Sequence, residues 1–168
     1  MIDQLNFREG MSRLVGAVTV ITTDGPAGAG GFTASAVCSV TDDPPMLVVC
    51  MNRNSRQHAV FSTNGVLCVN VLTAHQENIS RTFAGAATVQ ERFQVDRWSV
   101  LETGAPVLQN ALVNFDTRIV QTIEAGTHSI FLCSIVTVRM EPEDHPGLAY
   151  YGRKYHPVGA DRNPPPSL

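Results

Sequence analysis

The chain has 168 residues, a length typical of one domain with a well-buried core. Hydrophobic residues make up 43% of it, charged residues make up 16%, and the formal net charge is −3. This composition is that of a globular protein. It offers no basic surface for nucleic acid or anionic lipid, which argues against a partner of either kind. The low charged fraction also favours an extensive interface between subunits.

The cysteines and the N-terminal region bear on the setting of the protein. Cys38, Cys50, Cys68 and Cys133 are spaced too widely for a zinc knuckle or a redox dithiol. Each lies in an apolar run, so we predict small buried side chains with free thiols, in a reducing cytoplasm. The apolar segment 14–21 lacks the flanks of a signal peptide and is interpreted as a strand. No apolar run reaches the roughly 20 residues of a membrane-spanning helix.

Strands dominate the predicted secondary structure. Apolar residues at helical spacing predict short helices over 7–14, 55–61 and 74–84, with Ser55 as the N-cap of the second. Apolar and β-branched runs predict strands at 17–23, from 32 onward, and at 46–51, 65–72, 112–123, 128–140 and 148–151. The segment 124–127 is predicted to be a hairpin turn between the last two long strands. Many short strands, few helices and no βαβ alternation indicate an antiparallel barrel.

A glycine-rich segment at 24–31 resembles a nucleotide-binding loop only superficially. It lacks the G-x-G-x-x-G order, and a strand rather than a helix follows it, so we reject a Rossmann fold. At the other end, residues 161–168 contain three consecutive prolines and are predicted to be a frayed or extended tail.

The segment 31–45 is the most informative part of the sequence. Thr33, Ser35, Ser39 and Thr41 place hydroxyl groups at even spacing, which on an extended chain points them to one face. Small residues between them let backbone amides approach a ligand closely. This pattern suits a phosphorylated, hydroxyl-rich ligand. The alternative is an ordinary strand with one solvated face.

Polar residues at 52–56 form the best candidate for a phosphate site. The segment follows a buried strand and opens a helix, so free amides, a hydroxyl group and the guanidinium groups of Arg53 and Arg56 converge there. A capped polar loop with solvated arginines explains the same pattern.

Several segments, taken in order, resemble the flavin reductase family, the small NAD(P)H-dependent components of two-component flavin monooxygenases. Within the family, the reductase of 4-hydroxyphenylacetate 3-hydroxylase and the flavin reductase of pyrimidine utilisation are the most similar subfamilies. The matching segments are Gly16–Thr23, Gly31–Thr41, Pro44–Pro45, Leu67–Leu72, Gln76–Glu77, Phe83–Gly85, Glu91–Phe93, Trp98, Gly126–His128 and Tyr155–Val158.

The resemblance implies a split β-barrel of the FMN-binding type over residues 1–160, followed by the tail at 161–168. It also implies a homodimer with flavin near the subunit interface and a separate oxygenase that receives the reduced flavin. The cofactors are FMN or FAD, with NADH or NADPH as co-substrate. Because a cofactor carries the hydride chemistry, no protein nucleophile or metal is required.

The family places flavin contacts on matching segments of this chain. The implied residues are Thr33, Ala34, Ser35, Ala36, Val37, Ser39, Val40, Cys50, Met51, Asn52, Ser55, Arg56, Phe83, Ala84 and Gly85. The match also favours the phosphate interpretation of segment 52–56.

Histidines and C-terminal aromatic residues complete the candidate site. The family brings the histidine matching His128 to the nicotinamide; many members have Asp where this chain has Thr127, so we expect His128 to orient the amide without an acidic partner. A lone histidine at a strand start is otherwise an ordinary exposed side chain. Tyr155 and His156 either cover the flavin or nicotinamide or pack on the barrel. Three other histidines are expected to be solvated, namely His58, His75 and His145.

Two other functions remain open at this point. The scaffold could reduce another acceptor, such as a corrinoid, through bound flavin, or it could be a flavin-binding module without turnover. FMN against FAD, and NADH against NADPH, are also open, because no signature in the sequence separates them.

Overall fold

The computed structural model describes residues 2–141 and 145–159. Its helices are α1 (Gln4–Ser12), α2 (His58–Asn64), the 3-10 turn η1 (Ala74–Gln76), α3 (Glu77–Ala84) and α4 (Val89–Gln94). Its strands are β1 (Gly16–Ala17), β2 (Thr19–Thr23), β3 (Gly30–Ala34), β4 (Val37–Asp42), β5 (Pro45–Asn52), β6 (Val66–Val71), β7 (Trp98–Val100), β8 (Pro106–Leu108), β9 (Val113–Ala125), β10 (His128–Met140), β11 (Gly147–Tyr151) and β12 (Lys154–Val158).

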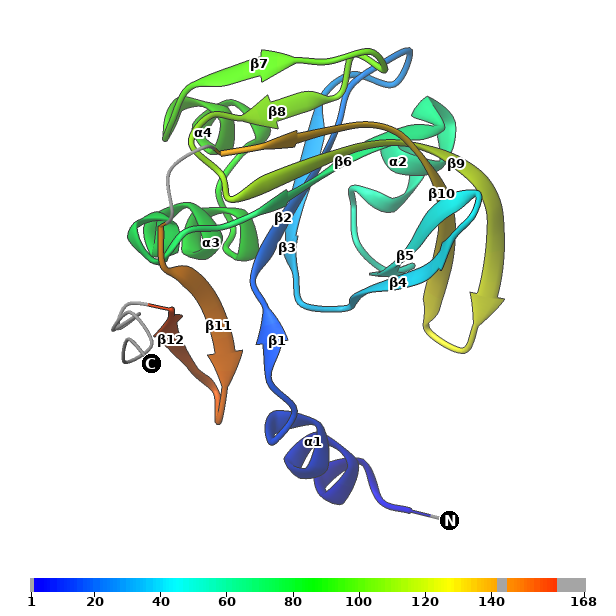
Figure 1. Cartoon of the computed structure of the whole chain (residues 1–168). Coiled ribbons are helices and arrows are strands. Elements are labelled where there is room, and N and C mark those ends of the chain that lie inside the picture. The colour runs from blue at the N-terminus through cyan, green and yellow to red at the C-terminus, as the bar shows by residue number, and fades with distance from the viewer. Residues whose placement is uncertain (1, 142–144, 160–168) are drawn as a thin grey trace.

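Seven antiparallel strands form the main sheet, in the order β3-β2-β6-β9-β10-β5-β4, and it curls into a barrel (Figure 1). The outermost strands, β3 and β4, are consecutive in the chain and are joined by Ser35 and Ala36. The long hairpin β9–β10 turns at Gly126, whose φ of 57° lies in the left-handed region that glycine adopts without strain. The predicted hairpin and antiparallel barrel are therefore confirmed.

The inside of the barrel is a continuous apolar core. Inward-facing residues alternate along β5, so that Leu47, Val49 and Met51 are at most 4% exposed. Helix α2 closes one end of the barrel by inserting Phe61, which is completely buried and packs edge-on against Phe32. This packing fixes where the chain leaves β5 and enters α2, the segment that carries the candidate phosphate residues.

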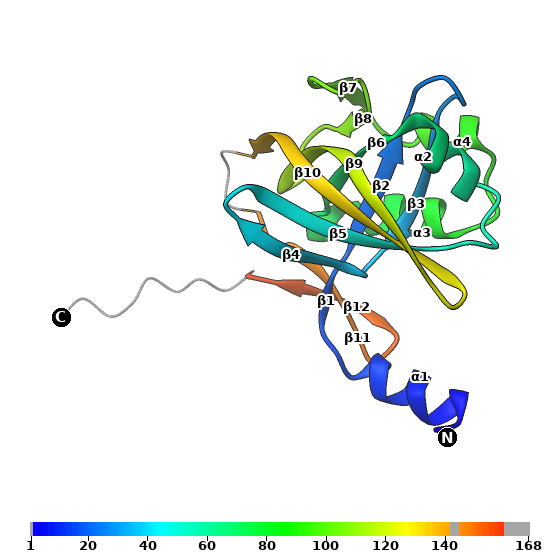
Figure 2. The same ribbon diagram turned by 90° about the vertical axis from the view of Figure 1, so that its right-hand side faces the viewer.

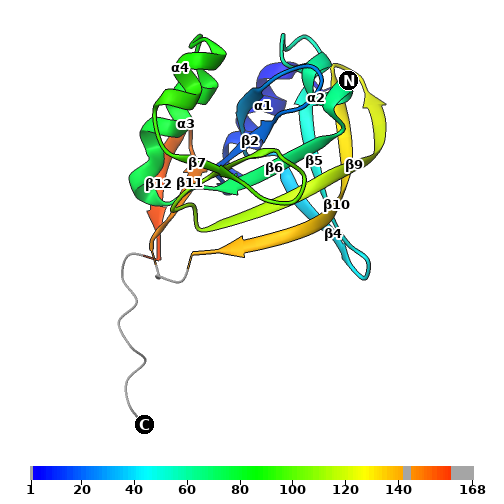
Figure 3. The same ribbon diagram turned by 90° about the horizontal axis from the view of Figure 1, so that it is seen from above.

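A second apolar cluster lies outside the barrel, between β2 and the helices α3 and α4, which sit together on one side (Figure 3). Phe83 of α3 is 1% exposed and contacts the rings of Phe93 and Trp98. A side chain on Gly31 would meet this ring, because an added Cβ would lie 2.5 Å from Phe83 Cε1. Helix α3 thus packs directly on the backbone of β3.

A three-stranded sheet, β1-β11-β12, and helix α1 extend away from the barrel (Figure 2). Asp3 caps α1 by accepting from the amides of Leu5 and Asn6. Glu9 joins α1 to the β11–β12 hairpin through an ion pair of 2.9 Å with Arg153. None of the residues of α1 is buried.

Some local predictions were wrong. Helix α2 begins at His58, and its N-cap is Gln57 rather than Ser55, because the chain makes further turns after β5. Cys38 is exposed rather than buried, since β4 is an edge strand with one open face. His58 is not solvated: its Nε2 lies 2.9 Å from Ser129 Oγ, and its ring stacks on Phe131.

Other parts of the chain went unpredicted or remain untested. Helix α4 and the β7–β8 hairpin were not predicted. Their elements are short, from three to six residues, so periodicity gives little signal there. The predicted tail at 161–168 lies outside the described residues.

Candidate functional site

A cavity of about 630 Å³ opens between β3, the segment before α2, and the loop between α3 and α4. It is lined by Phe32, Thr33, Ser55, Arg56, Gln57, Phe83, Ala84, Gly85, Ala86, Ala87, Thr88, Val89 and Arg92. Among the described residues, two arginines and no carboxylate stand in this lining, so the cavity favours an anionic ligand. We refer to it as the arginine cavity.

The segment after β5 forms one wall of the arginine cavity through a series of tight turns. Asn52 Oδ1 accepts from the amide of Asn54 at 2.9 Å, and Ser55 Oγ accepts from the amide of Gln57 at 3.3 Å. Arg56 is exposed, and within the described ranges its side chain makes no hydrogen bond or ion pair. A free guanidinium at the mouth of the cavity is available to a phosphate group.

A smaller pocket of about 220 Å³ adjoins the arginine cavity and shares Thr33 and Ala84 with it. Tyr150 and Tyr155 line its other side. A chain of hydrogen bonds fixes this wall: Thr33 Oγ1 donates to Ser80 O at 2.6 Å, and Ser80 Oγ lies 2.9 Å from the Tyr155 hydroxyl. We refer to this space as the tyrosine pocket.

Tyr155 is held from several sides. The guanidinium of Arg81 lies over its ring at 4.9 Å, and Tyr150 contacts it edge-on at 5.3 Å. Its ring also packs against the second apolar cluster. Tyr155 therefore packs on the protein and lines the tyrosine pocket at the same time; that it covers the flavin or nicotinamide stays a prediction.

The bend between β3 and β4 separates two groups of predicted flavin residues. Thr33 and Ala34 lie on β3, Ser35 and Ala36 in the bend, and Val37, Ser39 and Val40 on β4. The prediction that the four hydroxyl groups share one strand face was therefore wrong, and a bulge between Ser39 and Thr41 breaks the alternation again.

Of the predicted flavin residues at the end of β5, only some have side chains that a ligand can reach. Asn52 is exposed. Cys50 is half-buried, and this burial raises the pKa of its thiol above the ordinary value. Met51 is 2% exposed and belongs to the barrel core. A ligand can reach Met51 only through its main chain.

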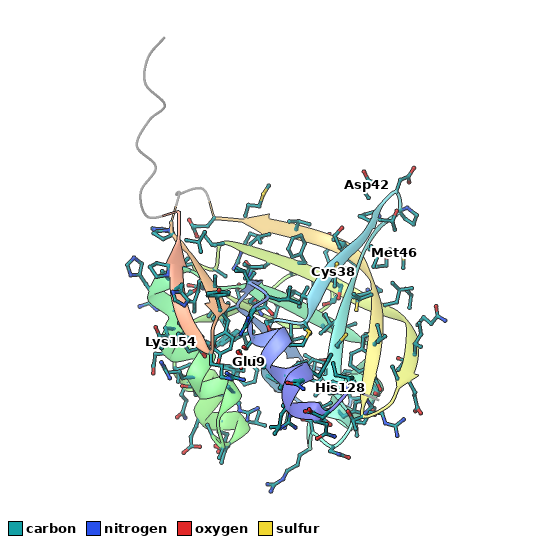
Figure 4. All side chains as sticks on the ribbon, turned by 90° about the horizontal axis from the view of Figure 1, so that it is seen from below. Glu9, Cys38, Asp42, Met46, His128 and Lys154 are labelled. Carbon is teal, nitrogen blue, oxygen red and sulfur yellow. The ribbon has the colours of Figure 1, made fainter. Side chains whose placement is uncertain are left out.

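His128 stands at the start of β10, directly opposite Asn52 of β5. Its side chain is exposed, and Nδ1 lies 2.9 Å from Thr127 Oγ1. Arg53 ties this turn to the candidate phosphate segment: its amide donates to Thr127 O at 2.9 Å, and its guanidinium pairs with Glu124. Figure 4 places His128 at the end of the sheet opposite Asp42.

His128 lies in the lining of neither the arginine cavity nor the tyrosine pocket. Of the predicted residues, the structure therefore brings Thr33, Ala34, Ser35, Ser55, Arg56, Phe83, Ala84, Gly85 and Tyr155 together around the two adjoining spaces. His128 joins this group only through its strand neighbour Asn52 and the turn that Arg53 holds.

Sequence reasoning missed the contribution of α4 and its preceding loop to the site. Thr88 and Arg92 line the arginine cavity, as does Gln57. The sequence did contain a signal, because Thr88 and Glu91 form a capping box in which each side chain bonds the other's backbone amide. That motif predicts a helix start at this point.

A flavin fits this donor set. The cavity supplies the free guanidinium of Arg56 and the hydroxyl group of Ser55 for a phosphate. Gln57 also lines the cavity, and its Oε1 is buried without a donor among the described residues. Residues that form a metal site are absent from the described part of the chain.

Comparison with known proteins identifies the class. Residues 11–159 match the flavin reductase like domain, and the chain belongs to this family. The FMN reductase (NADH) RutF of Serratia proteamaculans is 50% identical over 155 residues, covering 92% of this chain and 88% of that protein. The protein of the same name from Yersinia enterocolitica is 51% identical, covering 94% and 86%.

Solved structures agree. A crystallised flavin reductase candidate from Haemophilus somnus 129pt has a TM-score of 0.91 and 45% identity, covering 94% of this chain and all of that chain. The NADH:FAD oxidoreductase SgcE6 of Streptomyces globisporus, in complex with NAD and FAD fragments, has a TM-score of 0.87 and 27% identity, covering 96% of each chain. The predicted split β-barrel with a few short helices is confirmed.

Proposed function

We propose that this protein is a flavin reductase that transfers hydride from NADH to FMN and releases the reduced flavin to a separate oxygenase. The observation that carries the proposal is the acid-free arginine cavity, which lies where two family-matched segments, 55–56 and 83–85, meet. The relatives named FMN reductase (NADH) favour this nicotinamide and this flavin among the possible pairs.

Flavin binding falls to residues around the two spaces. Ser55 and Arg56 hold the phosphate, while Gln57 and the hydroxyl groups along β3 and β4 address the ribityl chain. A bound flavin supplies the acceptor for the hydride, so the protein contributes binding and orientation rather than a reactive group of its own. His128 orients the nicotinamide amide from the β9–β10 turn.

Turnover with free flavin tests the proposal. NADH oxidation is followed by absorbance with FMN, FAD and riboflavin as acceptors, and each is repeated with NADPH. We expect the highest kcat/KM for NADH with FMN. A corrinoid reductase would instead require the corrinoid for turnover, and a binding module would retain flavin after gel filtration without oxidising either nicotinamide. Absence of NADH and NADPH oxidation with all three flavins would exclude the proposed activity.

The proposed active form is a homodimer with the flavin site at its interface. Helix α1 supports this proposal, because Leu5, Phe7 and Met11 are 77, 56 and 49% exposed on a helix that projects from the body (Figure 2). If dimerisation completes the site, specific activity should fall on dilution. A monomer by light scattering that keeps full activity would rule this out.

The proposed setting is the cytoplasm. All four cysteines are free in the structure, as reducing conditions require. Among the helices described here, none is both long and apolar enough to cross a membrane.

A further inference from the structure

Arg92 occupies a distinctive position in the arginine cavity. It reaches from α4 between two other elements: Nη1 donates to Gly31 O of β3 at 2.5 Å, and Nη2 donates to Gly85 O at the end of α3 at 2.9 Å. Its guanidinium also lies 6.0 Å from the centre of the Phe83 ring. Two backbone carbonyl groups thus fix a guanidinium in the cavity lining.

Among the described residues, the charge of Arg92 has no counter-charge. In the ranges 2–141 and 145–159, no carboxylate pairs with it, and its Nε is buried without an acceptor. Burial lowers the pKa of the group below its ordinary value, yet a guanidinium stays protonated at neutral pH. Partial burial of an unpaired cation costs free energy unless an anion compensates for it.

Arg139 shows what a purely structural arginine looks like in the same molecule. It too is half-buried and bonded to neutral groups, but all three of its nitrogens have acceptors, namely Asn114 Oδ1, Ser99 Oγ and Leu108 O. Arg92 differs in leaving one nitrogen unsatisfied and in lining a cavity that holds a second arginine and no acid.

We infer that Arg92 is a specificity residue for the flavin phosphate, a second cation that, together with Arg56, makes the arginine cavity prefer a phosphorylated flavin to riboflavin. The inference rests on the proposed binding of flavin. Backbone carbonyl groups orient the guanidinium without neutralising it, so its full charge acts on the ligand. A phosphate dianion between two arginines supplies the compensation that the protein itself lacks.

The test compares two ligands that differ only in the phosphate. Dissociation constants for FMN and riboflavin are measured by fluorescence for the wild type and for Arg92→Met, Arg92→Lys and Arg97→Met. We expect Arg92→Met to raise the FMN constant about tenfold and to leave the riboflavin constant within about twofold. Arg97, exposed on the loop after α4 and outside both linings, is the matched control and should change neither.

The variant Arg92→Lys distinguishes the effect of the positive charge from the effect of the two hydrogen bonds to backbone carbonyl groups. Arg92→Lys keeps the positive charge but cannot bond both carbonyl groups as the planar fork does, so we expect it to retain most of the FMN preference. The preference of the wild type should also shrink as ionic strength rises, since salt screens the two arginines. If Arg92→Met does not fold, the lysine variant and the salt series still measure the same preference.

Several outcomes would overturn the inference. Equal losses of affinity for FMN and riboflavin in Arg92→Met would show that Arg92 is a purely structural bridge. No loss of affinity for either flavin would show that it has no part in binding. A lysine variant that loses the FMN preference as fully as the methionine variant would contradict a role of charge. NADH oxidation by the wild type is assayed separately: flavin that binds with this dependence but is not reduced would defeat the proposed function and leave the inference standing.

Discussion

The wall of the arginine cavity and the tip of the β9–β10 hairpin both carry candidate site residues, yet they are built in opposite ways. In the wall, Phe83 is 1% exposed, and Thr33 Oγ1 donates to Ser80 O at 2.6 Å, the contact that also joins this wall to the tyrosine pocket. At the tip, every residue from 121 to 128 is exposed. A substitution in the wall should therefore change ligand affinity and protein stability together. A substitution at the tip can change the rate of reduction while both of these stay the same.

Magnitudes support this division. A buried hydrogen bond contributes about 0.5–1.5 kcal/mol, and a buried donor or acceptor left without a partner costs about 1–3 kcal/mol. The side-chain connection between the tip and the candidate phosphate segment is the exposed pair Arg53 and Glu124, beside the backbone hydrogen bond from Arg53 to Thr127, and such a pair contributes about 0–1 kcal/mol. Substitutions in the wall should therefore have large effects on stability and ligand affinity, whereas substitutions at the tip should have smaller effects, mainly on rate.

The largest effect is expected from Gly31→Ala in the wall. The new Cβ would lie 2.5 Å from Phe83 Cε1 and 3.2 Å from Ile21 O, so either the ring or the strand must move. Overpacking of this kind should lower the free energy of unfolding by about 3 kcal/mol and weaken FMN binding as the cavity wall shifts. Urea unfolding and FMN fluorescence measure the two effects.

Gly10→Ala is the matched control for that substitution. An added Cβ at this position in α1 meets nothing within 4 Å, so the variant should be as stable as the wild type or more stable by about 0.5–1 kcal/mol. If Gly31→Ala loses no more stability than this control, the wall is not the tightly packed unit described here, and the contrast between the two regions fails.

The next effect is expected from Arg56→Ala, which tests the mouth of the cavity without disturbing its packing. Because Arg56 is exposed and has no partner among the described residues, stability should not change. Loss of a charge-assisted phosphate contact should cost about 1.5–3 kcal/mol of FMN affinity, or one to two orders of magnitude in Kd. Calorimetric or fluorescence titration with FMN and riboflavin measures this; an equal loss for both flavins would disprove the assignment of Arg56 to the phosphate.

A smaller and purely kinetic effect is expected from His128→Ala at the tip. Loss of one orienting hydrogen bond to the nicotinamide should slow hydride transfer about tenfold, while FMN affinity and stability stay unchanged. Stopped-flow reduction of bound flavin by NADH gives the rate, and fluorescence gives the Kd. A variant that loses FMN but reduces the remainder at the wild-type rate would reverse the role of His128 and blur the division between wall and tip.

The sequence predicted the barrel, and several of its candidate site residues lie together in the structure, for physical reasons that also explain where it failed. Long runs such as 112–123 and 128–140 carry enough β-branched and apolar residues to define strands by themselves. The burial of Met51, by contrast, depends on which face of β5 turns inward, and the place of Gln57 and Arg92 depends on how separate elements pack. Contacts between segments that are distant in the sequence cannot be predicted from the local pattern of residues.

The row of hydroxyl groups at 33–41 also shows that local pattern does not reveal tertiary structure. The smallest predicted effect concerns one of these groups, Ser39. An even spacing predicts one face only if the strand is unbroken, and here the bend at Ser35 and Ala36 and the bulge after Ser39 interrupt it. Ser39 therefore lies exposed on β4, an edge strand, away from the cavity linings.

Ser39→Ala should still weaken FMN binding, but by only about 0.5–1.5 kcal/mol, the contribution of one neutral hydrogen bond. The FMN and riboflavin dissociation constants should change together, because the proposed role of this hydroxyl group is toward the ribityl chain or ring rather than the phosphate. Ser62→Ala, exposed on α2 and outside both linings, is the control and should change neither constant. A serine variant indistinguishable from that control would confine flavin recognition to the arginine cavity and the tyrosine pocket, and would leave β4 a strand whose hydroxyl groups serve only the solvent.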